Sequence, residues 1–162
     1  MSDHAPPRYF FGNKALESNF LQYAFAHNGI TLPTSEHHLM REKAILMGDH
    51  ESRRKIEKAK TPRAAKSFGK KVKPWNQARW DLNCDQIMED ILVSKFSSSQ
   101  RMQDYILGIQ GRFYEASPWD RIWGIGISVA NAERGDLHRG QNKLGRALDR
   151  ARARIAAQVE DP

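Results

Sequence analysis

The stretch that decides the fold is TSEHHLMREKAILMG, residues 34–48. Thr34 is a favourable helix N-cap, because its side-chain oxygen can accept a hydrogen bond from an amide of the first turn. Gly48 follows the last apolar residue, and glycine is common just past the end of a helix. The stretch therefore predicts a helix that begins after Thr34 and ends at Gly48.

Two residues of this helix, Glu36 and Lys43, are candidates for catalysis. They stand seven positions apart, which is nearly two helical turns, so they point to the same face. Met40 and Met47 share that face, which indicates that part of it is buried. A desolvated lysine has a lowered pKa and can attack a carbon such as the anomeric carbon of ribose. The same spacing also fits an ordinary salt bridge or two solvated side chains.

Capping residues and turn signals place the other elements around this helix. Further helices are expected at residues 50–60, 62–69 and 77–96, from Ser98 or Ser99 to Gly111, and from about Asn142 onward. Strands are expected at residues 9–11 and 113–116, and Asn28-Gly29 is a hairpin signal within an ambiguous segment, residues 20–30. The fold class is therefore α+β, a helix-rich single domain with a small β-sheet.

The composition indicates one folded domain. The chain has 162 residues, of which 40% are hydrophobic and 9% aromatic, and both values are too high for a disordered chain. We expect the domain to span residues 9–158, with flexible termini at 1–8 and 159–162. No apolar run approaches the roughly 18 residues of a membrane span, and no signal peptide is visible. Because Cys84 is the single cysteine, we expect an intracellular protein, cytoplasmic or nuclear, without a membrane contact.

Positive charge gathers in two segments, and the formal net charge is +7 with a pI near 9.7. Both segments could attract a polyanion or a phosphorylated substrate, and each is also compatible with an ordinary solvated face. The first basic cluster contains Arg53, Arg54, Lys55, Lys58, Lys60, Arg63, Lys66, Lys70, Lys71 and Lys73. The second is a stripe on the last expected helix, formed by Lys143, Arg146, Arg150 and Arg154.

The segment after the second expected strand has the composition of a binding loop. Glu115 and Asp120 flank Ser117-Pro118-Trp119, and the loop ends in Trp123-Gly124-Ile125-Gly126. Glycine lets the backbone approach a ligand, and tryptophan stacks on rings. Cleavage of a glycosidic bond requires charge control near an oxocarbenium-like carbon and a proton for the leaving group, and Asp120 and Glu36 could divide these roles. Alternatively, both tryptophans belong to the core and Asp120 caps a turn.

Three further features leave alternatives open. Gly140-Gln141-Asn142 precedes a helix, whose N-terminal amides favour anions, or its asparagine is a plain N-cap. Trp75 and Trp80 lie beside basic residues and either stack on a base or belong to the core. His37 and His38 are adjacent, so a helix points them in different directions, and no metal-ligand spacing is visible. We therefore expect neither a metal nor a cofactor.

Taken together and in order, the motifs resemble one family over residues 10–152. The N-terminal aromatic and Ser-Asn-Phe signatures are followed by a Glu-His helix with a downstream Lys-Ala, then by an acidic loop and a C-terminal Gly-x-Asn signature. In this chain they are Phe10-Phe11, Glu17-Ser18-Asn19-Phe20, Ser35-Glu36-His37, Lys43-Ala44, Pro62 to Gly69, Trp75, Met88, Lys95-Phe96, Glu115-Ala116-Ser117, Asp120, Trp123-Gly124-Ile125-Gly126, Gly140-Gln141-Asn142, Leu144-Gly145 and Ala147-Leu148. In this order, the motifs of the chain resemble those of the NADAR family, also called YbiA-like.

This resemblance implies an N-glycosidase, which breaks a bond between a ribose carbon and a base nitrogen. Some members resemble hydrolases of early riboflavin-pathway intermediates, and others remove ADP-ribose from guanine in nucleic acid. For the second group a helix lysine is implied as the nucleophile, here Lys43, with Glu36 as the neighbouring acid or base and Asp120 at a ribose hydroxyl or assisting proton transfer. The implied substrate contacts are Asn19, Phe20, Trp75, Trp123, Gly124, Gly126, Gln141 and Asn142.

The basic clusters favour the second activity, with ADP-ribosylated DNA or RNA as the substrate. Hydrolysis of a riboflavin intermediate is the alternative, and a non-catalytic module that binds ADP-ribose or nucleic acid is a third hypothesis. The chain departs from the family pattern in four places. Glu17 stands where leucine is common, and residues 39–42 lack the glutamines that are frequent in the family. Leu137-His138-Arg139 stands where the family usually has a tryptophan, and Asp149 where it usually has a methionine. These departures bear on base and substrate preference, and the sequence leaves the oligomeric state open.

Overall fold

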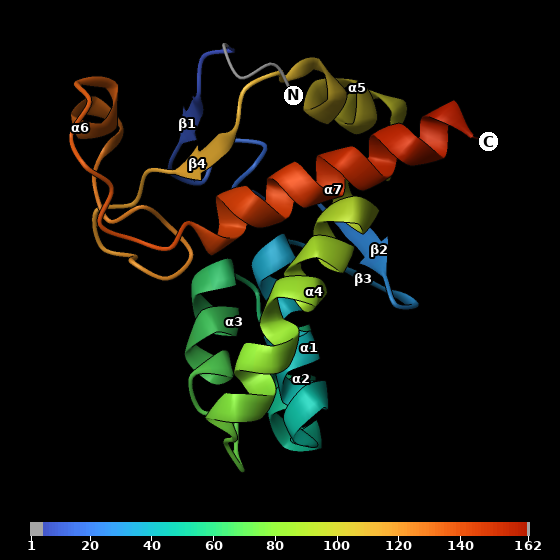
Figure 1. Cartoon of the computed structure of the whole chain (residues 1–162). Helices are drawn as coiled ribbons and strands as arrows, with labels where there is room; N and C mark the ends of the chain where they lie inside the picture. Colours follow the sequence, from blue (N-terminus) through green and yellow to red (C-terminus); the bar gives the residue numbers. More distant parts are fainter. Residues whose placement is uncertain (1–4, 162) are drawn as a thin grey trace.

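The computed structural model describes residues 5–161, and this part of the chain contains seven helices and four short strands (Figure 1). The helices are α1 Ser35–Met47, α2 His50–Lys58, α3 Pro62–Gly69, α4 Gln77–Phe96, α5 Gln100–Gly108, α6 Val129–Glu133 and α7 Lys143–Glu160. The strands are β1 Arg8–Phe10, β2 Phe25–His27, β3 Ile30–Leu32 and β4 Phe113–Glu115. The predicted fold class, helix-rich α+β with little sheet, is confirmed.

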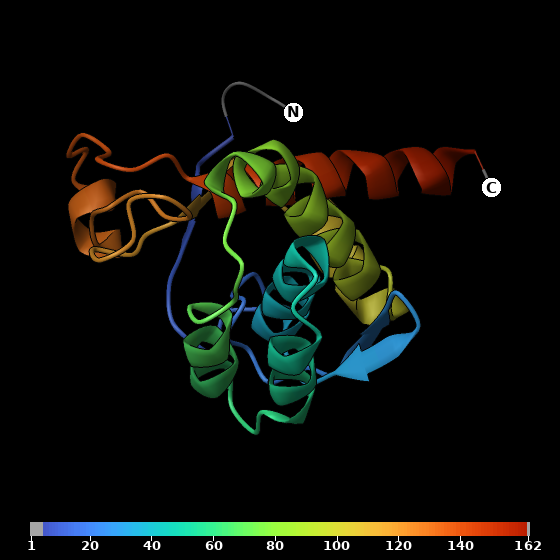
Figure 2. The same cartoon turned by 90° about the horizontal axis from the view of Figure 1, so that it is seen from below.

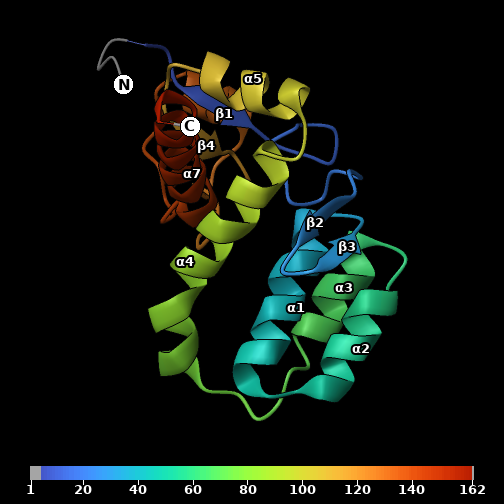
Figure 3. The ribbon, with the colours of Figure 1, turned by 90° about the vertical axis from the view of Figure 1, so that its right-hand side faces the viewer.

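Helix α4 is the centre of the fold. It packs against α7 on one side and α1 on the other, and α1 in turn contacts α2 and α3 (Figure 3). Figure 2 shows α1, α2 and α3 grouped on the side of α4 opposite to α7. Buried apolar side chains fill these contacts, among them Ala44 of α1, Ile91 and Leu92 of α4 and Leu148 of α7. Burial of each large side chain contributes about 1.5–3 kcal/mol.

Helix α1 begins and ends as its sequence predicts. The Thr34 hydroxyl accepts a hydrogen bond from the His37 amide at 3.2 Å, and Gly48 closes the helix in the left-handed conformation with φ of 75°. Gly69 at the end of α3 faces Met40 of α1 so closely that a Cβ atom would collide with the methionine side chain. The missing side chain therefore lets α3, with its basic residues, pack directly on α1.

The four strands form two separate two-stranded sheets. In one, β2 and β3 are antiparallel around Asn28 and Gly29, both of which have positive φ, so the predicted hairpin is confirmed. In the other, β1 and β4 are parallel, and Phe10 pairs with Glu115. This pairing places the loop that follows β1 beside the loop that follows β4.

Some boundaries differ from the sequence expectation. Helix α5 ends at Gly108 rather than near Gly111, because the guanidinium of Arg152 donates hydrogen bonds to the carbonyls of Ile109 and Gly111 and holds this turn open. The short helix α6 was not expected. Residues 1–4 and 162 of the expected flexible ends lie outside the described residues, whereas Arg8 belongs to β1 and α7 extends to residue 160. Within residues 5–161 no helix has both the length and the apolar character needed to cross a bilayer.

Candidate active site

A cavity of about 1040 Å³ lies between α1, α3, the start of α4, and the loops that follow β1 and β4. Eight of the eleven predicted site residues line it: Asn19, Phe20, Glu36, Lys43, Trp75, Asp120, Trp123 and Gln141. The other three, Gly124, Gly126 and Asn142, do not line this cavity. The fold thus gathers in one place residues that are up to 122 positions apart, from Asn19 to Gln141.

The Lys43 amine lies over two indole rings that pack against each other. It lies 4.6 Å from the ring centroid of Trp75 and 5.6 Å from that of Trp80. Burial lowers the pKa of Lys43, Glu36 opposes this shift, and the positive charge of Lys70 adds to it. In the described part of the chain Lys43 has no ion-pair partner within 4.0 Å. A larger share of this lysine is therefore the neutral, nucleophilic amine than of a solvated one.

Two carboxyl groups share the cavity with this amine, that of Glu36, which is buried, and that of Glu115, which is half-buried. Burial raises the pKa of Glu36 to about 7, against the opposing charges of Lys66 and Lys43. Burial also raises the pKa of Glu115 to about 7, and the negative charges of Asp120 and Glu36 add to the shift. Groups with pKa values near neutrality can both donate and accept protons at physiological pH.

Glu115 is a candidate site residue that the sequence-based prediction did not include. One of its carboxyl oxygens, Oε2, is buried without a hydrogen-bond partner, and the side chain lines the cavity. Sequence reasoning noted Glu115 beside the loop but gave it no role. The sequence shows only an acidic residue at the end of a strand. Its place in the cavity follows from the pairing of β4 with β1, which brings Glu115 near Glu36 of α1.

Asp120 combines a structural contact with a place in the cavity. Its Oδ1 accepts hydrogen bonds from the amides of Ile122 at 2.9 Å and Trp123 at 2.8 Å, so the turn-capping alternative is correct for this oxygen. Among the described residues Oδ2 has no hydrogen-bond partner. Asp120 can therefore present one oxygen to a ligand while the other keeps the loop folded.

The loop before β2 presents Asn19 and Phe20 to the cavity. Asn19 is 7% exposed, and its carbonyl oxygen Oδ1 has no hydrogen-bond partner. The loop is held from behind, because the buried amine of Lys95 donates to the Ser18 carbonyl at 3.0 Å and the Glu36 amide donates to the Asn19 carbonyl at 3.0 Å. The Lys66 amine lies 5.7 Å from the centroid of the Phe20 ring.

The residues before α7 fix the loop that follows β4. The amides of residues 141, 142, 143 and 144 donate to the carbonyls of residues 121, 124, 122 and 123. These amides, which the sequence suggested for a phosphate, are therefore already engaged. The Asn142 side chain does not cap α7 but donates to the Phe113 carbonyl at 2.9 Å and accepts from the Glu115 amide at 3.1 Å. Asn142 is thus a positioning residue for Glu115.

The glycines of this loop serve its folding. A Cβ atom on Gly124 would lie 2.9 Å from the carbonyl oxygens of Asp120 and Glu115, and Gly126 has φ of 73°. Both positions therefore require glycine for packing or backbone conformation.

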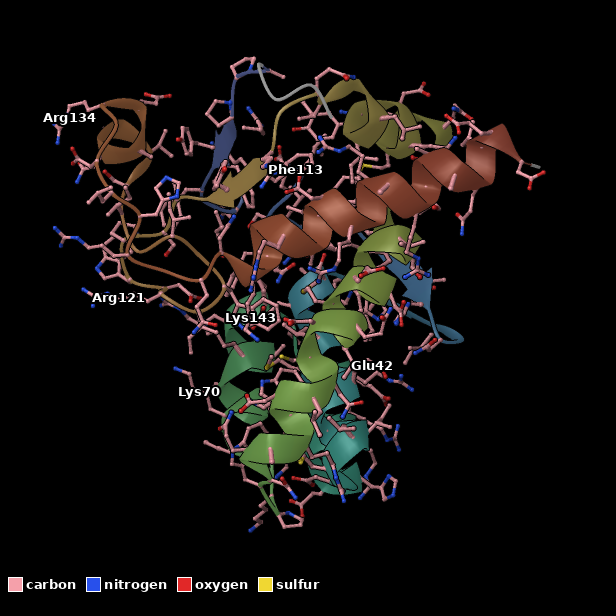
Figure 4. All side chains as sticks on the ribbon, viewed as in Figure 1. Glu42, Lys70, Phe113, Arg121, Arg134 and Lys143 are labelled. Carbon is pink, nitrogen blue, oxygen red and sulfur yellow. The ribbon has the colours of Figure 1, made fainter. Side chains whose placement is uncertain are left out.

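The two basic clusters have different surroundings. Arg63, Lys66 and Lys70 of the first cluster line the cavity, and Figure 4 shows Lys70 extending outward from the end of α3. On the C-terminal stripe, Arg150 pairs with Glu89 at 2.7 Å and Arg154 pairs with Asp90 at 2.6 Å. Arg150 and Arg154 therefore form an ionic contact between α7 and α4, whereas Lys143 pairs with Asp85 at 3.2 Å and also lines the cavity.

Fold and site together define a small α+β protein with a lysine and two carboxyl groups of raised pKa in one cavity. A model of the NADAR domain matches residues 2–156. The chain is 31% identical over 131 residues to Protein irg-1 of Caenorhabditis elegans, which covers 78% of this chain and 62% of that protein. The chain thus spans less than two thirds of the length of that relative.

Two further relatives are covered over most of their length. N-glycosidase R617 of Acanthamoeba polyphaga mimivirus is 29% identical over 137 residues, or 83% of this chain and 81% of that protein. N-glycosidase YbiA of Escherichia coli (strain K12) is 25% identical over 142 residues, or 87% of this chain and 81% of that protein. The NMR structure of E. coli YbiA superimposes with a TM-score of 0.79 at 22% identity, covering 96% of this chain and 88% of that one. The chain belongs to the NADAR family, in which relatives are named N-glycosidases.

Proposed function

We propose that this protein is an N-glycosidase that removes ADP-ribose from guanine bases of nucleic acid through a covalent intermediate on Lys43. The observation that carries the proposal is the position of the Lys43 amine, which lies over the rings of Trp75 and Trp80 in a cavity that also holds the buried carboxyl group of Glu36. Nucleophile, proton donor and stacking surfaces are thereby within one site.

The chemistry follows from the protonation states of these groups. The neutral amine of Lys43 attacks the anomeric carbon of the ribose, and a carbon–nitrogen bond forms as the bond to the guanine nitrogen breaks. Glu36, whose pKa is raised to about 7 by burial, supplies a proton to the departing base. The Oδ2 oxygen of Asp120 accepts a hydrogen bond from a ribose hydroxyl. The Glu36 carboxylate then takes a proton from the nitrogen of the adduct and returns it to the ring oxygen, so that the ribose opens and a protonated Schiff base links Lys43 to the former anomeric carbon. Water adds to this Schiff base, the bond to Lys43 breaks, and the surplus proton passes to Glu36, which releases ADP-ribose and restores both the amine and the carboxylic acid.

The charge and size of the cavity support a large, phosphate-bearing substrate. Its volume of about 1040 Å³ is at the upper end of the usual range of roughly 300–1,000 Å³ for ligand sites. Arg63, Lys66 and Lys70 line the same cavity and make its α3 side positive. These cations suit the diphosphate of ADP-ribose together with the phosphates of a nucleic-acid strand.

The direct test is incubation of the purified protein with an oligonucleotide that carries ADP-ribose on guanine, in EDTA, followed by mass spectrometry. We expect loss of the ADP-ribose mass with guanine intact. Addition of borohydride during turnover should trap the ring-opened intermediate as a stable adduct on the peptide that contains Lys43. An unchanged oligonucleotide would contradict the proposal. In that case, turnover of a riboflavin-pathway intermediate would point to the alternative substrate, and binding of ADP-ribose without turnover would point to a non-catalytic module.

A further inference from the structure

Trp119 does not pack against the hydrophobic core. Its side chain is 83% exposed, whereas Trp80 and Trp123 pack against the main hydrophobic core. Trp119 nevertheless lines the cavity, on the loop after β4, while Trp75 and Trp80 belong to the start of α4 and the segment before it. Because this exposed indole buries little apolar surface within the fold, its place at the cavity edge leaves that surface available to a ligand.

The surroundings of Trp119 form a small apolar platform. The ring of Phe11, 49% exposed, lies 6.0 Å from that of Trp119 at an angle of 45°, and Ile122 is 54% exposed. All three line the same cavity as Lys43. The platform is therefore continuous with the proposed reaction site but is formed by different segments from those that surround the Lys43 amine.

Cations stand beside this platform. Arg121 is exposed, follows Trp119 by two residues, and in Figure 4 extends toward the same side of the molecule as Lys70. Arg63 and Lys70 line the opposite, α3 side of the cavity. Exposed aromatic rings together with flanking cations are the means by which proteins hold single-stranded nucleic acid, because each base has a face to stack and each linkage a phosphate to pair.

From this arrangement we propose that the platform of Trp119, Phe11 and Ile122 binds a base that neighbours the modified guanine in a single strand. The inference rests on the proposed function, and it adds to that function a binding site for the strand beyond the modified guanine. The strand lies with one neighbouring base against Trp119 and with its phosphates between Arg121 and the α3 cations. Because stacking recognises any base, this contact adds affinity without sequence preference.

The experiment compares two substrates that carry the same ADP-ribosylated guanine, one as a mononucleotide and one within a single strand of about seven nucleotides. We expect Trp119→Ala to lower kcat/KM on the strand by about tenfold and on the mononucleotide by less than about twofold. Trp119→Phe should restore most of the activity on the strand. Leu82→Ala is the matched control, since Leu82 of α4 is 84% exposed and does not line the cavity, and it should leave activity on both substrates unchanged.

A strand with abasic sites on both sides of the modified guanine separates stacking from phosphate contacts. We expect the wild-type protein to lose its preference for this strand, so that Trp119→Ala has no further effect on it. Equal losses on the strand and the mononucleotide would overturn the inference, because Trp119 would then contact ADP-ribose itself. No loss on either substrate would also overturn it.

A binding measurement keeps the inference separate from the proposed function. Fluorescence anisotropy of an unmodified single strand should show about tenfold weaker binding to Trp119→Ala than to the wild-type protein. If the wild-type protein cleaves neither substrate, the proposed function fails, and this binding ratio still decides the role of the platform. Equal binding by both proteins would refute the platform.

Discussion

The cavity wall and the contact between α4 and α7 both carry many charges, but they handle them differently. In the α4–α7 contact, Arg150 and Arg154 both form ion pairs with carboxylates of α4, and Glu89 pairs with both of them. In the cavity wall, formed on the α3 side by Arg63, Lys66 and Lys70, no described carboxylate lies within ion-pairing distance of these cations. Paired charges hold two helices together, whereas unpaired charges leave a field that a ligand can use.

The acidic groups repeat this contrast. Glu89 of the α4–α7 contact is buried beside two guanidinium groups. In the cavity, burial raises the pKa values of Glu36 and Glu115 to about 7, and Glu115 retains an unpartnered oxygen. The cavity thus keeps groups in states that cost folding free energy, as active sites commonly do.

The largest expected effect is the loss of turnover on removal of the cavity amine. Lys43→Ala should lower kcat by about 1000-fold or more, because no other group replaces the nucleophile. Its melting temperature should change little, since Lys43 forms no ion pair with a described residue. Turnover is measured by mass spectrometry of the modified oligonucleotide. Lys58→Ala, an exposed lysine of α2 outside the cavity, is the control and should keep full activity. Full activity of Lys43→Ala would show that the mechanism is wrong.

The second effect concerns stability and pH. Burial raises the pKa of Glu36 from about 4.5 in the unfolded chain to about 7 in the folded protein. The folded state therefore binds the Glu36 proton more tightly than the unfolded chain does. The stability that this proton contributes is fully present at low pH and is lost as the pH rises from about 4.5 to about 7. The glutamine of Glu36→Gln cannot ionise. The free energy of unfolding of this variant should therefore rise relative to that of the wild-type protein by up to about 3 kcal/mol as the pH increases from 4.5 to 8. Urea denaturation at both pH values measures the difference.

Glu51→Gln is the control, because the pKa of Glu51 is shifted in the opposite direction from that of Glu36. The Lys55 hydrogen bond lowers the pKa of Glu51, so this exposed carboxylate stabilises the fold at higher pH rather than at low pH. Its replacement should therefore produce no gain with rising pH. A gain of the same size in both variants would show that the burial of Glu36 is not the cause.

Local signals made one part of the site predictable from the sequence. The cap at Thr34, the glycine at 48 and the helical period fix which way Glu36 and Lys43 point, because these are properties of a single helix. Likewise, Asn28-Gly29 specifies its hairpin through backbone conformation alone. Such features depend on neighbours within a few residues.

The contacts between distant segments were not predictable in the same way. Trp75 reaches Lys43 from 32 positions away, and Asn142 holds Glu115 from 27 positions away. Both basic clusters look alike in the sequence, because the carboxylate of Glu89, which pairs with Arg150, stands 61 positions earlier. Pairing across helices depends on the packing of the whole core, which no single segment encodes.

The smallest expected effects test the opening comparison directly, with two double variants that each remove two positive charges. Arg63→Ala with Lys70→Ala should raise KM for the modified strand about tenfold at low salt, less at high salt, with an unchanged melting temperature. Arg150→Ala with Arg154→Ala should leave KM within about twofold and lower stability by about 1 kcal/mol, or about 2–4 °C in Tm, because it leaves the buried Glu89 unpaired. Equal increases in KM would mean that the overall charge of the protein attracts the substrate. Distinct outcomes would locate the attraction in the cavity wall, since both variants have the same net charge.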